Sequence, residues 1–195
     1  MPSYPTPAAV RATAGAPLPL TKLTAYFRGR AAASMLDAVW VPVVSAVLIV
    51  LVGATGYWME QPWLFAGLGP TIFMVVSNPG HETTSLRAVV VGHMAAIACA
   101  YLAVLMLNAN EAPMLMSAEG AFSPRVLASA AALAMLALVQ PQLRAWHTPA
   151  AATALLITLG AYRMTGKTPI ALMAGVLVVV IGNELLRRVR PRGRK

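Results

Sequence analysis

Long runs of apolar residues alternate with short polar connections along the chain, and this pattern predicts its secondary structure. The apolar runs are continuous and do not alternate with polar residues, so they predict helices and not the strands of a membrane barrel. Several runs approach the length of about 20 residues that a helix needs to cross a bilayer. We predict six segments, at about residues 36–56, 62–77, 86–107, 125–139, 149–162 and 169–186.

Segments two and five differ from the others because they are short and contain a proline near their start. Pro70 follows Gly67 and Gly69 in segment two, and Pro149 opens segment five. The order long, short and long therefore occurs twice. In transporters built from inverted repeats, short or broken segments at matching positions form the binding site. We therefore predict an all-α polytopic membrane protein of two inverted three-segment repeats, with segments two and five short or broken.

Composition agrees with this class. Hydrophobic residues make up 58% of the chain and charged residues only 11%, whereas soluble domains carry about 25% charged residues. The one cysteine, Cys99, lies in an apolar run, and we interpret it as a small buried side chain. The three histidines lack a ligand-like spacing, so we predict neither a metal nor a cofactor.

The formal net charge of +9 is concentrated at the two ends of the chain. Basic residues that flank membrane spans follow the positive-inside rule, which favours a membrane role over nucleic-acid binding. We predict a basic, partly disordered cytoplasmic region at 1–35, a transmembrane domain at 36–187 and a basic cytoplasmic tail at 188–195. Within the first region, residues 21–33 are expected to form a basic amphipathic helix on the membrane surface.

The distribution of charges in the loops favours six crossings. If every segment crosses, both termini are cytoplasmic, and loops 57–62 and 108–124, which lack basic residues, lie outside. Re-entrant segments two and five would place loop 108–124 inside, which its acids and its lack of bases oppose. Only Arg163 and Lys167 disagree with six crossings.

The start of segment five has the features of an anion site. Pro149 suits the first helical turn, and Thr148 before it is a favoured N-cap. The first amides of a helix lack intrahelical partners, and in a bilayer they must find another acceptor. Helix N-termini bind anions for this reason. We expect the backbone from Pro149 through Ala150 and Ala151 to contact the ligand, with His147 as an added donor.

Segment two repeats these features with Gly69, Pro70 and Thr71. We predict that the two helix starts face each other near the bilayer midplane and form one electropositive pocket. Ionisable groups at membrane depth are functional by default, so we add His93 of segment three, and the hydroxyl of Thr153 completes the set.

Other polar residues favour structural roles. Glu184 precedes Arg187 and Arg188 by three and four residues, which predicts a local ion pair. Arg87 begins segment three and is expected to reach the interface. No nucleophile elbow, phosphate-binding loop or carboxylate pair indicates an enzyme, and we predict no catalytic residues.

Several of these motifs resemble the HPP family of integral membrane proteins. The matching pieces are Gly69-Pro70-Thr71, Asn78-Pro79, Arg87 with Gly92-His93, and the stretch from His147 to Leu155, which reads HTPAAATAL. Thr148 replaces the first proline of the family's His-Pro-Pro signature. The family includes plastid and cyanobacterial members implicated in nitrite transport. The resemblance therefore implies a small inorganic anion, nitrite-like, as substrate, and a bacterial inner membrane as location.

Together these inferences predict a transporter or channel for a small anion, embedded in the lipid bilayer. Two alternatives stay open, a membrane subunit that scaffolds a partner and an intramembrane enzyme that uses His147 or His93. A homo-oligomer is compatible with a chain of 20.5 kDa.

Overall fold

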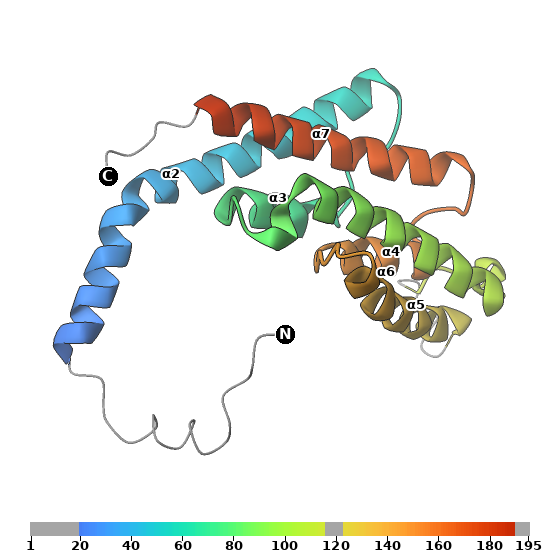
Figure 1. Cartoon of the computed structure of the whole chain (residues 1–195). Coiled ribbons are helices and arrows are strands. Elements are labelled where there is room, and N and C mark those ends of the chain that lie inside the picture. The colour runs from blue at the N-terminus through green and yellow to red at the C-terminus, as the bar shows by residue number, and fades with distance from the viewer. Residues whose placement is uncertain (1–19, 116–122, 190–195) are drawn as a thin grey trace, which may run out of the picture. The chain divides into compact units, whose positions relative to one another are not determined.

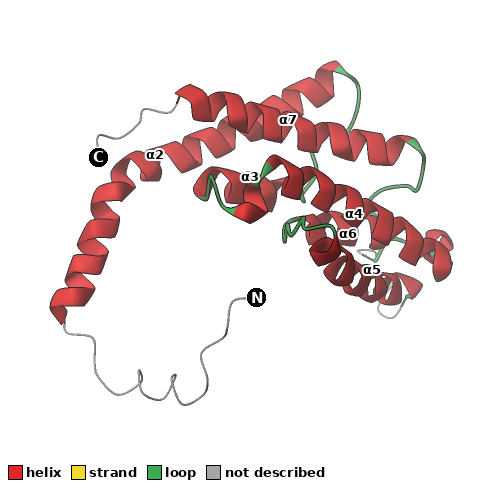
Figure 2. Ribbon diagram, in the orientation of Figure 1, coloured by secondary structure: helices red, strands yellow, loops and turns green. Residues whose placement is uncertain are grey.

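The computed structural model describes the backbone of residues 20–115 and 123–189, and the side chains of this part from residue 38 onward. Within it, helices and loops account for the whole secondary structure, and no strand is present (Figure 2). This confirms the predicted all-α class. The helices are α2 (Leu20–Trp58), α3 (Leu68–Ser77), α4 (Leu86–Met106), α5 (Pro124–Gln142), α6 (Ala150–Thr158) and α7 (Lys167–Val189), with short 3₁₀ turns η1 (Glu82–Thr84) and η2 (Ala109–Glu111).

The chain forms two compact units, residues 1–40 and 41–195, and α2 continues from the first into the second. The described part of the first unit is helix from Leu20 onward. The second unit contains the rest of α2 and every other helix, and all contacts discussed below lie within it.

Among the described residues, four helical stretches are long and apolar enough to cross a membrane: Ala38–Trp58, Leu86–Met106, Pro124–Gln142 and Lys167–Val189. Helices α3 and α6 have 10 and 9 residues, so each rises only about 15 Å, half of a hydrocarbon core of about 30 Å. The helix lengths therefore repeat the order long, short and long. The number of crossings and the inverted orientation of the halves stay predictions.

Helix α4 lies at the centre of the second unit and packs against α5, α6 and α7 (Figure 1). Close packing is possible because its buried face is made largely of small side chains, which let neighbouring helices approach. These are Ala88, Gly92, Ala95, Ala96, Ala100 and Ala103. Large apolar side chains such as Phe73, Leu102 and Ile170 point outward and are exposed, as expected of a surface that faces lipid.

Several predicted boundaries were wrong. Helix α3 begins only at Leu68, although segment two was expected from about residue 62, and α6 ends at Thr158, although segment five was expected to reach about residue 162. Helix α2 begins at Leu20 and includes the predicted amphipathic segment at 21–33, whose side chains lie outside the described residues. Helix α5 continues through Pro141 to Gln142, although we expected it to end earlier. Proline in the last turn removes only one backbone hydrogen bond, so the helix tolerates it there. The predicted disorder of the first residues concerns 1–19, outside the described residues.

Arg125, a buried residue in the first turn of α5, connects α5 by hydrogen bonds to the loop after α4 and to the end of α6. Its Nε donates to the carbonyl oxygens of Ala112 and Pro113 at 2.9 Å each. Its other nitrogens donate to Ala112 at 2.6 Å, to Thr158 at 3.2 Å and to Asn110 at 3.4 Å. All these acceptors are backbone carbonyls, so this side chain ties the loop after α4 and the end of α6 to α5.

We expect Arg125→Met to destabilise the protein by about 3 kcal/mol, because buried carbonyls would lose their donors. Unfolding can be followed with a thiol-reactive dye, since the one cysteine, Cys99, is buried in the native state. Arg163→Met at the same end of the bundle is the matched control, because Arg163 is exposed, and it should change stability by less than about 0.5 kcal/mol. Equal losses for both variants would contradict the fastening role of Arg125.

Candidate functional site

Four polar side chains from four segments meet inside the second unit. Thr71 comes from α3, His93 from α4, Thr153 from α6, and His147 from the turn that precedes α6. Each is at most 1% exposed, although their surroundings are apolar. We call these four residues the His–Thr cluster. A polar group this deep must be hydrogen-bonded, so the geometry of the cluster shows how it is built.

The two histidines are joined through one hydroxyl group. Oγ1 of Thr71 lies 3.0 Å from Nε2 of His93 and 3.3 Å from Nε2 of His147. The other ring nitrogen of His93, Nδ1, lies 2.9 Å from Oγ1 of Thr153. The imidazole centroids are 5.2 Å apart. Helices α3, α4 and α6 are therefore linked by hydrogen bonds between side chains.

A second set of bonds holds His147 in place. Its Nδ1 lies 2.8 Å from the carbonyl oxygen of Thr83 in η1. The side-chain amide of Gln140 donates to the carbonyl of His147 at 3.1 Å and accepts from its backbone N–H at 3.3 Å. Gln140 lies near the end of α5 and is 4% exposed, so both of these hydrogen bonds are shielded from solvent. The imidazole of His147 is thus oriented toward Thr71 by two neighbouring elements.

Glycine at two positions lets the segments of the cluster approach. A Cβ at Gly92 would lie 2.8 Å from Cβ of His147, and a Cβ at Gly67 would lie 2.8 Å from Oγ1 of Thr153. Both distances are shorter than side chains tolerate. Gly92 therefore lets α4 pass against the turn of His147, and Gly67 lets α3 start against α6.

Of the ten residues predicted for the site, the structure brings four together in the His–Thr cluster. Pro149 and Ala150, which follow His147 closely in the sequence, are buried, and Ala151 is half-buried. Gly69, Pro70 and Thr148 are exposed. No atom of another segment lies within 4 Å of a Cβ built on Gly69. The predicted site is thus divided into a buried side-chain cluster and an exposed remainder.

The prediction that the first backbone amides of the two short helices are unpaired was wrong. The amides of Ala150, Ala151 and Ala152 donate to the carbonyls three residues earlier, at 3.0 to 3.1 Å. The amides of Leu68 and Gly69 do the same, at 3.0 and 3.2 Å. The turn before each helix already supplies these acceptors, as a 3₁₀ turn at a helix end does.

Thr148 is not the N-cap of α6 either. The helix begins at Ala150 with Pro149 at the cap position, and no side-chain oxygen caps it. The polar groups buried at the start of α6 are therefore side chains, those of His147 and Thr153, and not unpaired backbone amides.

The residues that support the cluster are only weakly marked by sequence patterns. Gln140 is a polar residue in an otherwise apolar run, seven positions before His147, and this could have marked it. Thr83 offers its backbone carbonyl, which no side-chain pattern indicates. Arg87 was expected to reach the interface, and it is exposed and donates to the carbonyl of Leu143 at 3.2 Å.

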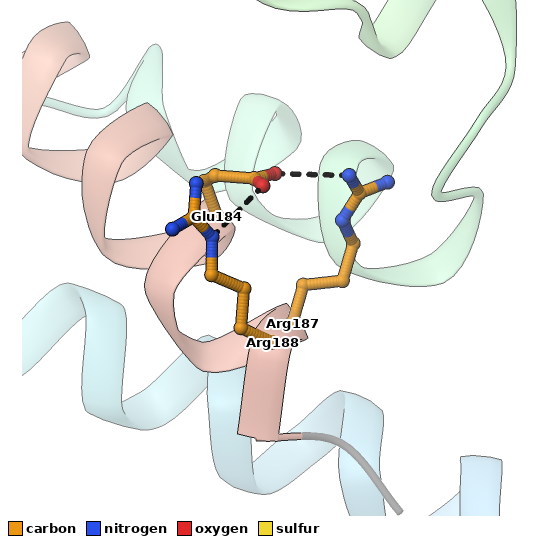
Figure 3. A network of polar contacts seen from close by, with 3 residues as sticks. All are labelled: Glu184, Arg187 and Arg188. Carbon is orange, nitrogen blue, oxygen red and sulfur yellow. Dashed lines mark hydrogen bonds and ion pairs between the residues drawn. The ribbon is translucent and has the colours of Figure 1, made fainter. Parts of the chain in front are cut away.

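The ion pair predicted at the end of α7 is confirmed. Glu184 contacts Arg187 at 3.0 Å and Arg188 at 3.4 Å, and Figure 3 shows its carboxylate between the two guanidinium groups. All three side chains are well exposed, so the pair contributes little to stability. Within the described residues, no group of three or more His, Cys, Asp or Glu side chains could hold a metal ion.

Two cavities lie at opposite ends of α4. One, of about 620 Å³, is lined by Arg125, Arg163, Asn110 and two tyrosines, and none of its lining residues in the described part of the chain is a carboxylate. The other, of about 560 Å³, is lined by the starts of η1 and α4 and by the end of α7, with Glu82, Glu184, Arg187 and Arg188 among its residues. His93 lies between them, roughly 10 Å along α4 from Leu86 and 12 Å from Tyr101.

Comparison with known families identifies the family of this chain. The family model described as HPP, transmembrane region, matches residues 30–194. The chain belongs to the HPP transmembrane family. No curated protein and no solved structure matches it. The resemblance predicted from the motifs is thereby confirmed, and this HPP protein is a membrane protein in contact with the lipid bilayer.

We expect Gly92→Ala to push the His147 turn away from α4 and to destabilise the protein by about 1–3 kcal/mol, the usual cost of overpacking. Gly69→Ala is the matched control. It lies in the first turn of α3 with open space around it, and alanine favours helix, so stability should stay equal or rise. Dye labelling of Cys99 during heating measures both. A Gly92→Ala variant as stable as the native protein would contradict the close approach.

Proposed function

We propose that this HPP protein transports a small inorganic anion, nitrite-like, across the membrane, and that the anion passes through the His–Thr cluster. The observation that carries the proposal is the burial of two histidines and two threonines where the two short helices begin. Polar groups inside a membrane protein are costly and mark ligand pathways by default. Two short helices at matching positions are typical of transporter binding sites.

The chemistry of the cluster suits an anion. Its side chains offer N–H and O–H donors, and no carboxylate takes part in it. In the arrangement that the structure shows, the hydroxyl groups and ring nitrogens of the cluster bond one another. If the short helices separate, the same donors become available to a guest in an apolar surrounding, where each hydrogen bond to a charge is strong.

The surroundings of the cluster support passage in both directions. Among the described residues, the cavity at the end of α6 is lined by Arg125 and Arg163 and by no carboxylate, which makes it attractive to anions. The second cavity lies at the other end of α4, and the cluster lies between the two. A rocking movement of one half of the protein against the other would connect the cluster with each cavity in turn.

Transport is preferred to catalysis because neither imidazole of the cluster faces an open cavity. Both point at the hydroxyl of Thr71, and both are fully buried. It is preferred to a scaffold because a scaffold requires small residues at helix contacts but no buried polar cluster.

In liposomes, we expect the purified protein to accelerate uptake of sodium nitrite over protein-free vesicles. Thr153→Val keeps the shape of the side chain but removes the hydroxyl that bonds His93, and it should slow uptake by about tenfold. Thr55→Val is the matched control, because Thr55 bonds only carbonyls of its own helix. It should leave uptake unchanged.

Nitrate and chloride serve as further probes of the substrate class. If the protein moves none of these three anions, transport of a small inorganic anion is wrong, and a scaffold becomes the better interpretation. If Thr153→Val transports at the native rate, the path does not run through the cluster.

A further inference from the structure

The hydrogen bonds of the His–Thr cluster have a direction that can be assigned from one fixed end. Nδ1 of His147 faces a carbonyl oxygen, that of Thr83, at 2.8 Å, and a carbonyl can only accept. Nδ1 therefore carries a proton. In the neutral ring Nε2 is then an acceptor, and the only hydroxyl bonded to it is that of Thr71, at 3.3 Å.

The rest of the chain of bonds follows from the single proton of that hydroxyl. Because Thr71 donates to His147, its oxygen must accept from Nε2 of His93, at 3.0 Å. Nδ1 of His93 then accepts from the hydroxyl of Thr153, at 2.9 Å. The bonds run in one direction, from Thr153 through His93, Thr71 and His147 to the carbonyl of Thr83. This direction belongs to the state in which both histidines are neutral, the less costly state in an apolar interior without a counter-charge.

The cluster can also accept one more proton without leaving a donor unbonded. A proton that arrives from water forms an N–H bond at Nε2 of His147, and this group then donates to the oxygen of Thr71. The Thr71 hydroxyl turns to the carbonyl oxygen of Gly67, which lies 3.2 Å away. On release the same N–H bond breaks and the hydroxyl turns back. Thr71 is thus a switch between two fully bonded arrangements.

The charge that this proton brings has no counter-charge in the structure. Helices α3 and α6 contain no ionisable residue. The charged groups on the other adjoining segments are exposed, as is His81: Arg87 on α4, Arg144 before His147, and Glu82 with His81 at η1. The remaining titratable groups of α4, the buried Cys99 and the half-buried Tyr101, carry no charge at neutral pH and lie six and eight residues beyond His93. Arg125, at the far end of α5, bonds backbone carbonyls. An uncompensated charge in such a place is costly.

An anion beside His147 would remove this cost, and a proton on His147 would remove the cost of burying the anion. Each ligand then strengthens the binding of the other by the same factor, as linkage requires. We therefore expect the cluster to bind the proton and the anion together or to bind neither.

We propose that the protein moves one proton together with each anion, that His147 holds the proton, and that the hydroxyl of Thr71 switches between His147 and Gly67 as the proton comes and goes. This inference rests on the proposed transport function and names the co-transported ion. It makes transport electrically neutral.

Proteoliposomes that contain a trapped pH-sensitive dye test the coupling. An inward gradient of sodium nitrite is imposed near neutral pH, and anion uptake and lumenal pH are recorded together. Protein-free vesicles correct for nitrous acid that crosses the bilayer by itself, and sodium nitrate is the second probe. We expect the lumen to acidify by one proton per anion taken up. Clamping the membrane potential with potassium and valinomycin should leave the initial rate unchanged.

Two substitutions of the same residue test the switch. Thr71→Ser keeps the hydroxyl and should retain both fluxes and their one-to-one ratio. Thr71→Val removes it and should lower anion and proton flux together by about tenfold or more. Thr55→Val removes a hydroxyl that bonds only carbonyls of its own helix, so it is the control and should behave as the native protein.

The outcomes separate this inference from the function on which it rests. Anion uptake that stalls without the clamp and leaves lumenal pH unchanged would overturn proton coupling while transport stands. An absence of anion uptake would overturn both. Native anion uptake in Thr71→Val, or loss of uptake in Thr71→Ser, would overturn the role of the Thr71 hydroxyl.

Discussion

The arrangement of the second unit depends on the requirement that polar groups buried among apolar side chains bond one another. His93, His147, Thr71 and Thr153 would each be costly alone in this interior, and together they satisfy one another. The same requirement fixes the surrounding segments, because Gln140 bonds the backbone of His147 and Thr83 accepts from its ring. Thr71 of α3 and Thr153 of α6 both bond His93, which ties the two short helices to α4.

Tight packing around α4 gives the cluster its rigidity. The face that α4 buries is made largely of alanine and glycine, and Gly92 brings its backbone against the turn of His147. Such an interior has few intermediate arrangements, so the cluster is either closed on itself or opened by a movement of whole helices. In the proposed transport, a guest would have to replace existing hydrogen bonds, so selectivity would depend on the hydrogen-bond donors of the cluster.

The two ends of the bundle differ in electrostatics. Around the start of α5, Arg125 is satisfied by backbone carbonyls, so its positive charge is not neutralised by a carboxylate partner. At the end of α7, the carboxylate of Glu184 contacts two arginines. Among the described residues, the lining of the first cavity includes two arginines and no carboxylate, whereas the lining of the second combines both signs of charge. An anion that reaches the cluster would meet different fields on its two sides.

The sequence by itself determined the class, the helices and the family. Continuous apolar runs can only be satisfied as helices in a bilayer, and their lengths distinguished the long helices from the two short ones. The Gly-His and His-Thr-Pro motifs marked His93 and His147 because polar residues are rare in such runs. The ion pair at Glu184 also followed from helical spacing, which is a local property.

Tertiary structure decided how these residues are used. Whether the first amides of α3 and α6 are free depends on the turns before them, and these turns supply the acceptors. The meeting of Thr71 with two histidines, 22 and 76 positions further along the chain, depends on how three helices pack. The anchoring of Arg125 depends on carbonyls of distant segments, which have no side-chain signature. Local patterns therefore identified the polar residues, but only packing over long sequence separations could assign their partners.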